Sequence, residues 1–249
     1  MSARRIVSLV PSLTEALFAL GLGGRVVGVT DWCVHPARAV AGLPRVGGTK
    51  DTDVDAVLAL APDLVLANRE ENTRRTVEKL RAAGLAVWVT YPRTVREAAA
   101  LLRRLAGLGA DAQAVARVVE PVEEAVAAGP PAATSRVFCP VWRDPWMTVG
   151  PDTYAHDLLR LCGGENVFGD RRGRRYPLVS LAEAEAAAPK VVLLPDEPYP
   201  FGPGDAEELG GLLSARIHLV DGTLVSWYGP RILQAIEFLR PLLAPRMGN

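Results

Sequence analysis

The sequence lacks an excess of either charge. Its 28 Lys and Arg residues balance its 28 Asp and Glu residues, so the formal net charge at pH 7 is 0. A balanced chain produces no overall field that would attract nucleic acid or an anionic membrane surface. We therefore expect no nucleic-acid partner, and any ligand must be recognised by a local group of side chains.

The sequence also lacks a long apolar run. No stretch approaches the roughly 18 uninterrupted apolar residues that a membrane-spanning helix needs. The apolar run near the N-terminus is interrupted by Pro11 and Glu15, and no small-residue cleavage site follows it, so it does not have the pattern of a secretory signal. As written, the chain is expected not to span a membrane and to be cytoplasmic, or to work on the periplasmic or extracellular side if a leader has been trimmed from it.

Cysteine and catalytic motifs are sparse. The 3 cysteines, Cys33, Cys139 and Cys162, are odd in number and have no CxxC spacing, which argues against a disulfide framework and a structural zinc site. A P-loop, a nucleophile elbow and a Ser-His-Asp arrangement are missing as well. Cys33 with His35 is the nearest pair to a nucleophile and base, and no third orienting group is evident. We expect a protein that is not an enzyme and holds no intrinsic cofactor.

What the chain does have is apolar residues, 49% of 249, in short β-rich runs that alternate with helical periodicity. This alternation predicts an α/β fold with mostly parallel sheets. Ser12 with Glu15 and Ser180 with Glu183 have the spacing of capping boxes, and Gly21 marks a helix end. The expected strands are 4–10, 25–30, 63–67, 86–90, 136–141, 190–195 and 216–222, and the expected helices are 11–24, 53–62, 73–84, 95–109, 111–128, 152–164, 180–189 and 229–244.

The turn-forming stretch 129–135 divides this pattern in two. We predict an N-terminal α/β lobe over 1–109, a single long connecting helix within 110–129 that Pro121 kinks, and a C-terminal α/β lobe over 130–249. In parallel sheets, ligands bind beyond the carboxyl ends of the strands. A ligand cleft is therefore expected between the two lobes.

Aromatic side chains gather in the loops that follow the expected strands, whereas Trp88 lies within a strand and is assigned to the core. Large aromatics at strand ends commonly line binding surfaces, although covering the core of the second lobe is an alternative for Trp142 and Trp146. The loop residues of interest are Pro11, Ser12, Asp31, Trp32, Cys33, His35, Asn68–Asn72, Tyr91–Arg93, Trp142–Trp146, Tyr199, Phe201, Trp227, Tyr228 and Arg231.

Several stretches together resemble the class III, or helical-backbone, substrate-binding proteins of ABC importers for cobalamin, heme and iron–siderophore complexes. They are "RIVSLVPSLTEALFALGLGGRVVGVT", "LPRVGGTKDTDVDAVLALAPDLVLA", "GGENVF" and "SWYGPRI". The "WCVHP", "VGGTKD" and "NREEN" segments resemble the helical backbone metal receptor subgroup. The resemblance implies two lobes joined by a rigid helix, a metal-chelate ligand and an importer permease as partner.

The resemblance implies specific residues as well. "SWYGPRI" is similar to the segment that supplies a ligand-facing tryptophan in cobalamin-binding members, which points to Trp227. Asn68 stands where those members have a tryptophan, and Arg74 stands where they carry a glutamate that docks on the importer. Glu70 and Glu71 are candidates to replace that acid.

Cys33 and His35 are two residues apart, so in an extended loop both could bind one soft or borderline metal ion. Alternatively, one of them makes an axial contact to a metal already held in a macrocycle. As a third possibility, Cys33 packs as a small apolar side chain while His35 forms a hydrogen bond within its turn.

We therefore predict a binding protein for a metal-bearing tetrapyrrole, with cobalamin or a related corrinoid as the first choice. A receptor for a free metal ion or an iron–siderophore complex, and a cytosolic sensory or catalytic protein that reuses the fold, are the alternatives. The expected ligand-binding residues are Trp32, Lys50, Asn68, Arg69, Glu70, Trp142, Trp146, Trp227, Tyr228 and Arg231, with Cys33 and His35 as candidate metal ligands.

Overall fold

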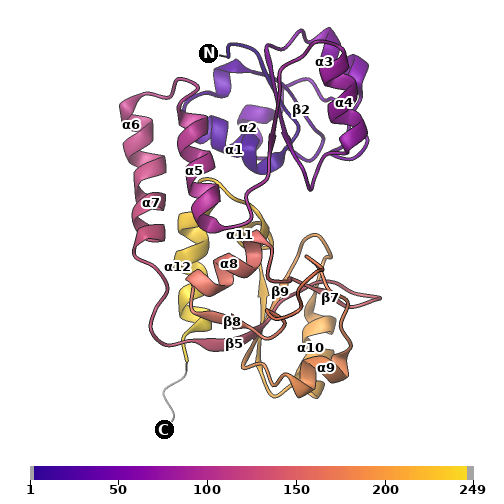
Figure 1. The fold of residues 1–249 in the computed structure, drawn as a ribbon, viewed down its shortest axis with the longest axis vertical. Helices are drawn as coiled ribbons and strands as arrows, with labels where there is room; N and C mark the ends of the chain where they lie inside the picture. The colour runs from indigo at the N-terminus through magenta and orange to yellow at the C-terminus, as the bar shows by residue number, and fades with distance from the viewer. Residues whose placement is uncertain (1–2, 246–249) are drawn as a thin grey trace. The chain divides into compact units, whose positions relative to one another are not determined.

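The computed structural model describes residues 3–245 and contains two parallel α/β sheets in two compact units (Figure 1). The first unit takes the chain up to Pro92 together with Glu97–Glu123 and Tyr228–Pro230, and the second takes Arg93–Arg96, Glu124–Trp227 and the described residues from Arg231 onward. The predicted α/β class with parallel sheets in two lobes is confirmed.

The sheet of the first unit has the strand order β2-β1-β3-β4, and every neighbouring pair is parallel. Its strands are β1 (Ile6–Ser8), β2 (Val26–Val29), β3 (Leu64–Asn68) and β4 (Val87–Thr90), and helices α1 (Pro11–Ala19), α2 (Ala37–Val40), α3 (Val54–Ala59), α4 (Arg74–Ala82) and α5 (Val95–Ala106) accompany them. All three residues of β1 are buried, as expected for a central strand with both faces covered.

The sheet of the second unit has the order β10-β9-β5-β8 and is also parallel. Its strands are β5 (Ser135–Phe138), β8 (Gly164–Asn166), β9 (Val191–Pro195) and β10 (Arg216–Val220), and β6 (Pro140–Trp142) pairs antiparallel with β7 (Met147–Thr148) beside it. The helices are α8 (Tyr154–Leu161), α9 (Leu181–Ala186), α10 (Pro203–Leu212), α11 (Thr223–Ser226) and α12 (Arg231–Leu243).

The sequence does not predict α10, although Pro203 occupies its first turn and the Asp205 carboxylate accepts a hydrogen bond of 2.8 Å from the Gly202 N–H. Gly210 and Gly211 lie near the C-terminal end of this helix. Each glycine in a helix costs about 1 kcal/mol relative to alanine, which weakens the helical signal in the sequence.

Two of the predicted capping patterns have different outcomes. The Ser180 and Glu183 capping box at α9 is confirmed. The Ser12 and Glu15 box is wrong, because the residue that precedes α1 is Val10 and not Ser12. The helix begins with Pro11, and Ser12 is buried inside it. Proline is favoured at the first helical position, where its missing N–H costs nothing. Gly21 does end this helix, with a φ of 74°.

The helical stretch after Asp111 is not uniform. It comprises α6 (Ala112–Ala114), a π-helical turn over Val115–Val119 and α7 (Glu120–Ala127). Pro121 has no N–H and its ring crowds the preceding turn, so a wider turn just before it is the expected accommodation. The chain passes from the first unit to the second inside α7, between Glu123 and Glu124. The boundaries at 109 and 129 stay a prediction.

Asn68 and Asn72 fasten the carboxyl ends of β1 and β3. The Asn72 Oδ1 accepts a hydrogen bond of 2.8 Å from the Asn68 N–H, and its Nδ2 donates to the Leu9 and Thr49 carbonyl oxygens over 3.2 and 3.0 Å. Asn72 is only 4% exposed. One side-chain amide therefore ties together three backbone segments at the edge of the sheet where a ligand is expected.

Asn72→Ala is expected to lower the free energy of unfolding by about 2 kcal/mol, because it leaves buried backbone groups without partners. Urea unfolding followed by far-UV circular dichroism measures the change. The control is Arg75→Ala, an exposed position in α4, which begins two residues after Asn72. It should change the free energy by less than about 0.5 kcal/mol. Equal unfolding midpoints for the two variants would contradict the role given to Asn72.

Candidate functional site

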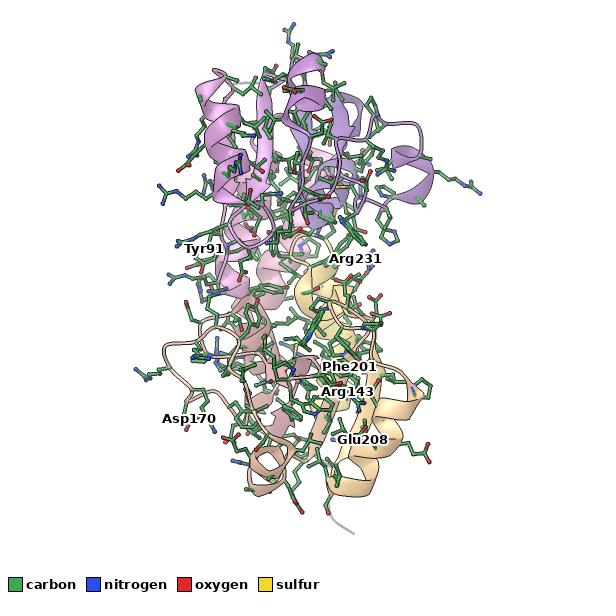
Figure 2. All side chains as sticks on the ribbon, turned by 90° about the vertical axis from the view of Figure 1, so that its right-hand side faces the viewer. Tyr91, Arg143, Asp170, Phe201, Glu208 and Arg231 are labelled. Carbon is green, nitrogen blue, oxygen red and sulfur yellow. The ribbon has the colours of Figure 1, made fainter. Side chains whose placement is uncertain are left out.

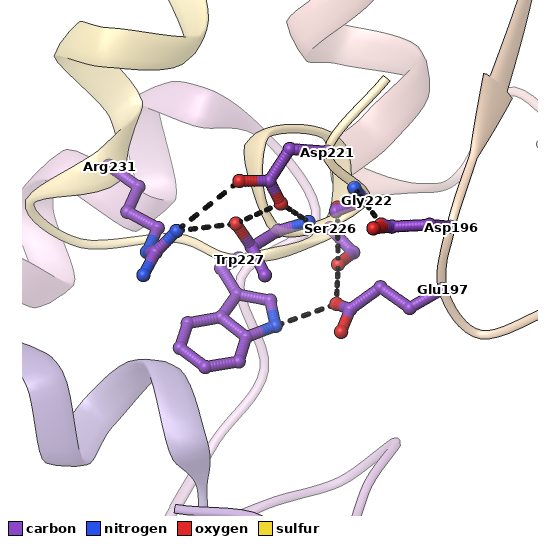
Figure 3. Close-up of polar contacts among 8 residues, drawn as sticks. Asp196, Glu197, Asp221, Gly222, Ser226, Trp227 and Arg231 are labelled. Carbon is purple, nitrogen blue, oxygen red and sulfur yellow. Dashed lines mark hydrogen bonds and ion pairs between the residues drawn. The ribbon is translucent and has the colours of Figure 1, made fainter. Parts of the chain in front are cut away.

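In the second unit, the loops that leave the carboxyl ends of β9 and β10 are bonded to each other (Figure 3). The Gly222 N–H donates to Asp196 Oδ1 over 2.7 Å, and the Ser226 hydroxyl donates to Glu197 Oε1 over 2.8 Å. Because β9 and β10 are parallel neighbours, both loops leave the same edge of the sheet. This edge is where open α/β sheets bind their ligands.

Trp227 is held by this pair of loops. Its indole Nε1–H donates to Glu197 Oε1 over 2.7 Å, and the Arg231 guanidinium lies 5.0 Å from the centre of the ring (Figure 3). Trp227 is partly buried. A hydrogen bond at the edge and a cation over one face fix the plane of the indole, which prepares it to stack on a flat ligand.

Arg231 is itself held in place. Its Nη1 donates to the Thr223 hydroxyl over 2.5 Å and lies 3.8 Å from Asp221 Oδ2, and only 13% of its side chain is exposed. The Asp221 carboxylate also accepts from the Thr223 N–H over 2.9 Å. The guanidinium is therefore a support for Trp227 rather than a freely moving surface charge.

Gly222 is required by the close approach of the two loops. A Cβ at this position would lie 2.4 Å from the Glu197 Cγ, 2.7 Å from its backbone nitrogen and 2.9 Å from its backbone oxygen. Two of these atoms belong to the backbone, so a side chain here would push the loops apart.

A chain of aromatic contacts continues from the same β9 loop. Tyr199 meets Trp142 edge to face with ring centres 5.7 Å apart, Phe201 lies 4.7 Å from Tyr199, and Trp146 stacks on Phe201 at 5.8 Å. Phe201 is buried, whereas Trp142 is 43% exposed. The chain of rings thus runs from the apolar core of the unit to an exposed indole.

Arg143 closes this aromatic chain on the buried side. Its guanidinium lies 5.5 Å from the Trp146 ring, pairs with the Asp205 carboxylate and is 2.8 Å from Glu208 Oε2 (Figure 2). Both acids belong to α10. This guanidinium helps to hold the Asp205 carboxyl pKa below its usual range, although burial opposes the shift.

In the first unit, Asn68 and Tyr228 form a buried pair. The Asn68 Nδ2 donates to the Tyr228 hydroxyl over 2.6 Å, and the two residues are 2% and 8% exposed. Burial raises the pKa of the Tyr228 hydroxyl well above its usual range, and the nearby Glu71 carboxylate adds to the rise. The phenol therefore stays neutral. Their roles as ligand contacts stay a prediction, which this burial does not favour.

The end of β3 and the loop after it hold three of the predicted residues, Asn68, Arg69 and Glu70. The Asn68 Oδ1 accepts from the backbone N–H groups of Glu70 and Glu71 over 2.7 and 3.3 Å, and Lys50 donates to the Glu70 carbonyl oxygen. The Arg69 guanidinium lies 4.9 Å from the centre of the Tyr91 ring. Hydrogen bonds thus link Lys50, Asn68 and Glu70 to one another and use much of their polarity within the protein. The role of Lys50, Arg69 and Glu70 as ligand contacts stays a prediction.

Trp32 and Cys33 are neighbours in sequence and lie in opposite environments. Trp32 is 66% exposed, whereas Cys33 is fully buried. The Cys33 sulfur accepts from the Thr14 hydroxyl over 3.2 Å and lies 3.1 Å from the Thr30 hydroxyl, and burial raises the pKa of the thiol. Cys33 therefore packs as a small buried side chain, which is the alternative to a metal ligand given in the sequence analysis.

His35 is partly buried in the same loop. Within residues 3–245, His, Cys, Asp and Glu side chains form no group of three or more that could hold a metal ion. A metal role for Cys33 and His35 stays a prediction, and the protonated, inward-facing thiol does not favour it.

The strongest part of the site is one that the sequence does not predict. Glu197 binds the Trp227 indole across 30 residues of sequence, and Tyr199 contacts Trp142 across 57. These pairs meet because β9 lies beside both β10 and β5 in the sheet. The signal available in the sequence is "EPYPF", a segment with acidic and aromatic residues directly after an apolar strand.

Residues 6–208 match the family described as periplasmic binding protein. The chain belongs to this family. The vitamin B12-binding protein of Yersinia pestis (strain Pestoides F) is 30% identical over 200 residues, which cover 78% of this chain and 70% of that protein. The family resemblance recognised in the sequence is therefore confirmed.

Two solved structures show how closely this periplasmic binding protein follows the family fold. The periplasmic vitamin B12 binding protein BtuF of Vibrio cholerae superposes with a TM-score of 0.80 at 24% identity, over 97% of this chain and 96% of that one. The periplasmic heme-binding protein RhuT from Roseiflexus sp. RS-1 gives 0.79 at 26% identity, over 96% and 97%. Each of these relatives is named as a binding protein.

The family bears on the expected location as well. The expectation of a cytoplasmic protein finds no support, because these relatives are periplasmic binding proteins. Within residues 3–245 of this periplasmic binding protein, each helix is too short or too polar to cross a membrane.

Gly222→Ala is expected to lower the free energy of unfolding by about 1–3 kcal/mol, because the added methyl group collides with the Glu197 backbone. The emission of Trp227 should change at the same time, since Glu197 holds its indole. Gly42→Ala is the control, because this exposed glycine lies in a turn outside the helices and a Cβ there meets nothing within 4 Å. Equal stability of both variants in urea would show that the loops do not require the glycine.

The free energy of unfolding is expected to fall as the pH rises above about 9. Burial raises the pKa of Cys139 and of Cys162 to about 12, and that of Cys33 in the same direction. In the unfolded chain the thiols lose their protons near pH 8.5, whereas the buried thiols of the folded protein keep theirs. The free energy of unfolding is therefore at its full value below that pH. Above it, each buried cysteine lowers the free energy of unfolding by about 1.4 kcal/mol per pH unit. Urea unfolding between about pH 7.5 and 10.5 measures the slope, and replacing Cys139 and Cys162 by alanine should reduce it. A flat profile in the unaltered protein would contradict the burial of the thiols.

Proposed function

We propose that this protein is the substrate-binding component of an ABC-type importer and that it binds a metal-bearing tetrapyrrole, with a corrinoid such as cobalamin as the first choice. The loops that leave the carboxyl ends of β9 and β10 in the second unit are central to the proposed binding. The observation that carries the proposal is the fixed indole of Trp227, bonded at its edge to Glu197 and covered on one face by Arg231. A tryptophan held in one plane suits a large flat ligand, because the side chain loses little conformational entropy when the ligand binds.

Each unit also has an exposed tryptophan that is a candidate for a ligand contact. Trp142, supported by Tyr199, and Trp32 are among the most exposed large apolar side chains in the described part of the chain. Exposed aromatic side chains at the ends of parallel strands are typical of binding surfaces. Lys50, Arg69 and Glu70 would supply polar contacts in the first unit.

The donor set favours a metal that arrives already chelated. A bare transition-metal ion needs several protein ligands with matched geometry. Cys33 is buried and protonated, so the loop around it offers few such ligands, whereas a macrocycle brings its own nitrogen donors. For this reason, a receptor for a free metal ion is the weaker alternative. Binding of an iron–siderophore complex is an outcome of the test below.

The relatives support a corrinoid first and heme second. The Yersinia pestis relative, 30% identical, is named for vitamin B12, and RhuT, 26% identical, is named for heme. We propose that this protein works on the periplasmic side, as family members do, and delivers its ligand to a permease. Catalysis forms no part of the proposal.

The test is a titration of the purified protein with cyanocobalamin, hemin, a ferric siderophore and zinc, followed by tryptophan emission and by calorimetry. Cyanocobalamin should bind saturably with a Kd of micromolar or tighter. Trp227→Ala should raise that Kd by about 10- to 100-fold, as expected when a buried stacking contact of about 1.5–3 kcal/mol is lost.

Trp88→Phe is the matched control. Trp88 lies in β4 of the first unit, near the amino end of the strand, with the Arg104 guanidinium 4.7 Å from the centre of its ring. This variant should leave the Kd unchanged. Binding of zinc alone, lost in Cys33→Ala with His35→Ala, would overturn the tetrapyrrole proposal.

A further inference from the structure

The loop from Glu197 to Phe201 contacts three separate tryptophans. Glu197 bonds to the Trp227 indole, Tyr199 meets Trp142 edge to face, and Phe201 stacks on Trp146. All three tryptophans are among the predicted ligand-binding residues. The position of this loop therefore decides how the second unit presents its aromatic surface.

The backbone of this loop has little freedom. Pro198 and Pro200 each fix a φ angle, and the Phe201 N–H donates to the Tyr199 carbonyl oxygen over 2.9 Å. At its beginning, Asp196 is bonded to the Gly222 N–H. At its end, Phe201 is 5% exposed and belongs to the apolar core. Glu197 is thus held between two fixed points.

Glu197 uses one oxygen for two contacts. Its Oε1 accepts from the Trp227 Nε1–H over 2.7 Å and from the Ser226 hydroxyl over 2.8 Å. Both donors belong to the loop after β10, so the carboxylate sets the indole against the backbone of that loop (Figure 3). An ionised acceptor makes a stronger hydrogen bond than a neutral one, which suits a positioning role.

The charge around Trp227 is unbalanced. Asp196, Glu197 and Asp221 bring three carboxylates to the two loops, and Arg231 brings one guanidinium (Figure 3). A ligand whose rim carries carboxylates would meet like charge here, which costs free energy and weakens its binding. A ligand whose rim carries neutral amides would meet hydrogen-bond acceptors instead.

We propose that Glu197 is a positioning and selectivity residue of the proposed ligand site: it fixes the Trp227 indole and favours an amide-bearing macrocycle over one that carries carboxylates. This inference rests on the proposed function and narrows its ligand class. Cyanocobalamin, with neutral amide side chains, and hemin, with two propionates, are the probes that separate the two classes.

The experiment compares Glu197→Gln and Glu197→Ala with the unaltered protein. Glutamine keeps an acceptor oxygen and removes the charge, so the Kd of cyanocobalamin should change by less than about 3-fold while the Kd of hemin falls by about 3- to 10-fold. Alanine removes the acceptor too, so the Kd of cyanocobalamin should rise by about 10-fold, the loss expected for a charge-assisted hydrogen bond. Glu207→Gln, an exposed position on α10, loses the same charge and should change neither Kd.

The positioning role has its own readouts. In a Trp227→Ala background, Glu197→Ala should have no further effect on the Kd of cyanocobalamin, because the indole that it positions is gone. In the absence of ligand, the emission and near-UV circular dichroism assigned to Trp227 should change in Glu197→Ala and be restored in Glu197→Gln.

The outcomes separate the inference from the function on which it rests. If the unaltered protein binds neither macrocycle, the proposed function fails, and the ligand-free spectra still decide whether Glu197 positions Trp227. If cyanocobalamin binds and the ratio of the two Kd values is the same in Glu197→Gln as in Glu207→Gln, the selectivity role is wrong. If Glu197→Ala weakens binding equally with and without Trp227, the positioning role is wrong.

Discussion

The second unit depends on the contact between the loops that follow β9 and β10. Asp196 accepts a hydrogen bond from the Gly222 N–H, and the missing side chain of Gly222 lets the Glu197 backbone approach closely. Without this approach, the Glu197 carboxylate would not reach the Trp227 indole. A backbone constraint therefore comes before the aromatic surface, because the side chains can be ordered only after the two loops are fixed.

The first unit solves the same problem with neutral groups. There, the amides of Asn68 and Asn72 bind backbone N–H and carbonyl groups at the ends of β1 and β3. An amide both donates and accepts, so one side chain satisfies several buried groups without the cost of burying a charge. As a consequence, the amide of Asn68, which the sequence analysis placed among the ligand contacts, is hydrogen-bonded within the protein in this structural role.

The sequence predicts the fold better than the site, for a physical reason. The alternation of apolar strands and amphipathic helices is local, and it predicts seven of the eight strands in the two four-stranded sheets, from Ile6–Ser8 to Arg216–Val220. It misses β8 (Gly164–Asn166), whose residues lie at and beyond the end of the expected helix 152–164. The pairing of Glu197 with Trp227 is not local, because it depends on which strands become neighbours. Loop geometry is equally hidden: Trp32 and Cys33 are adjacent in the sequence, yet one is 66% exposed and the other is buried beneath threonine hydroxyls.

The arrangement of charge gives this site its chemical character. A planar macrocycle can stack on Trp227 whatever its rim carries, so stacking alone supplies affinity and little selectivity. In the proposed site, carboxylates beside the ring would add the selectivity, because they would repel one class of rim and accept hydrogen bonds from another. The same carboxylate that orients the indole would thus also discriminate between ligands, and an ionised acceptor serves both proposed roles better than a neutral one would.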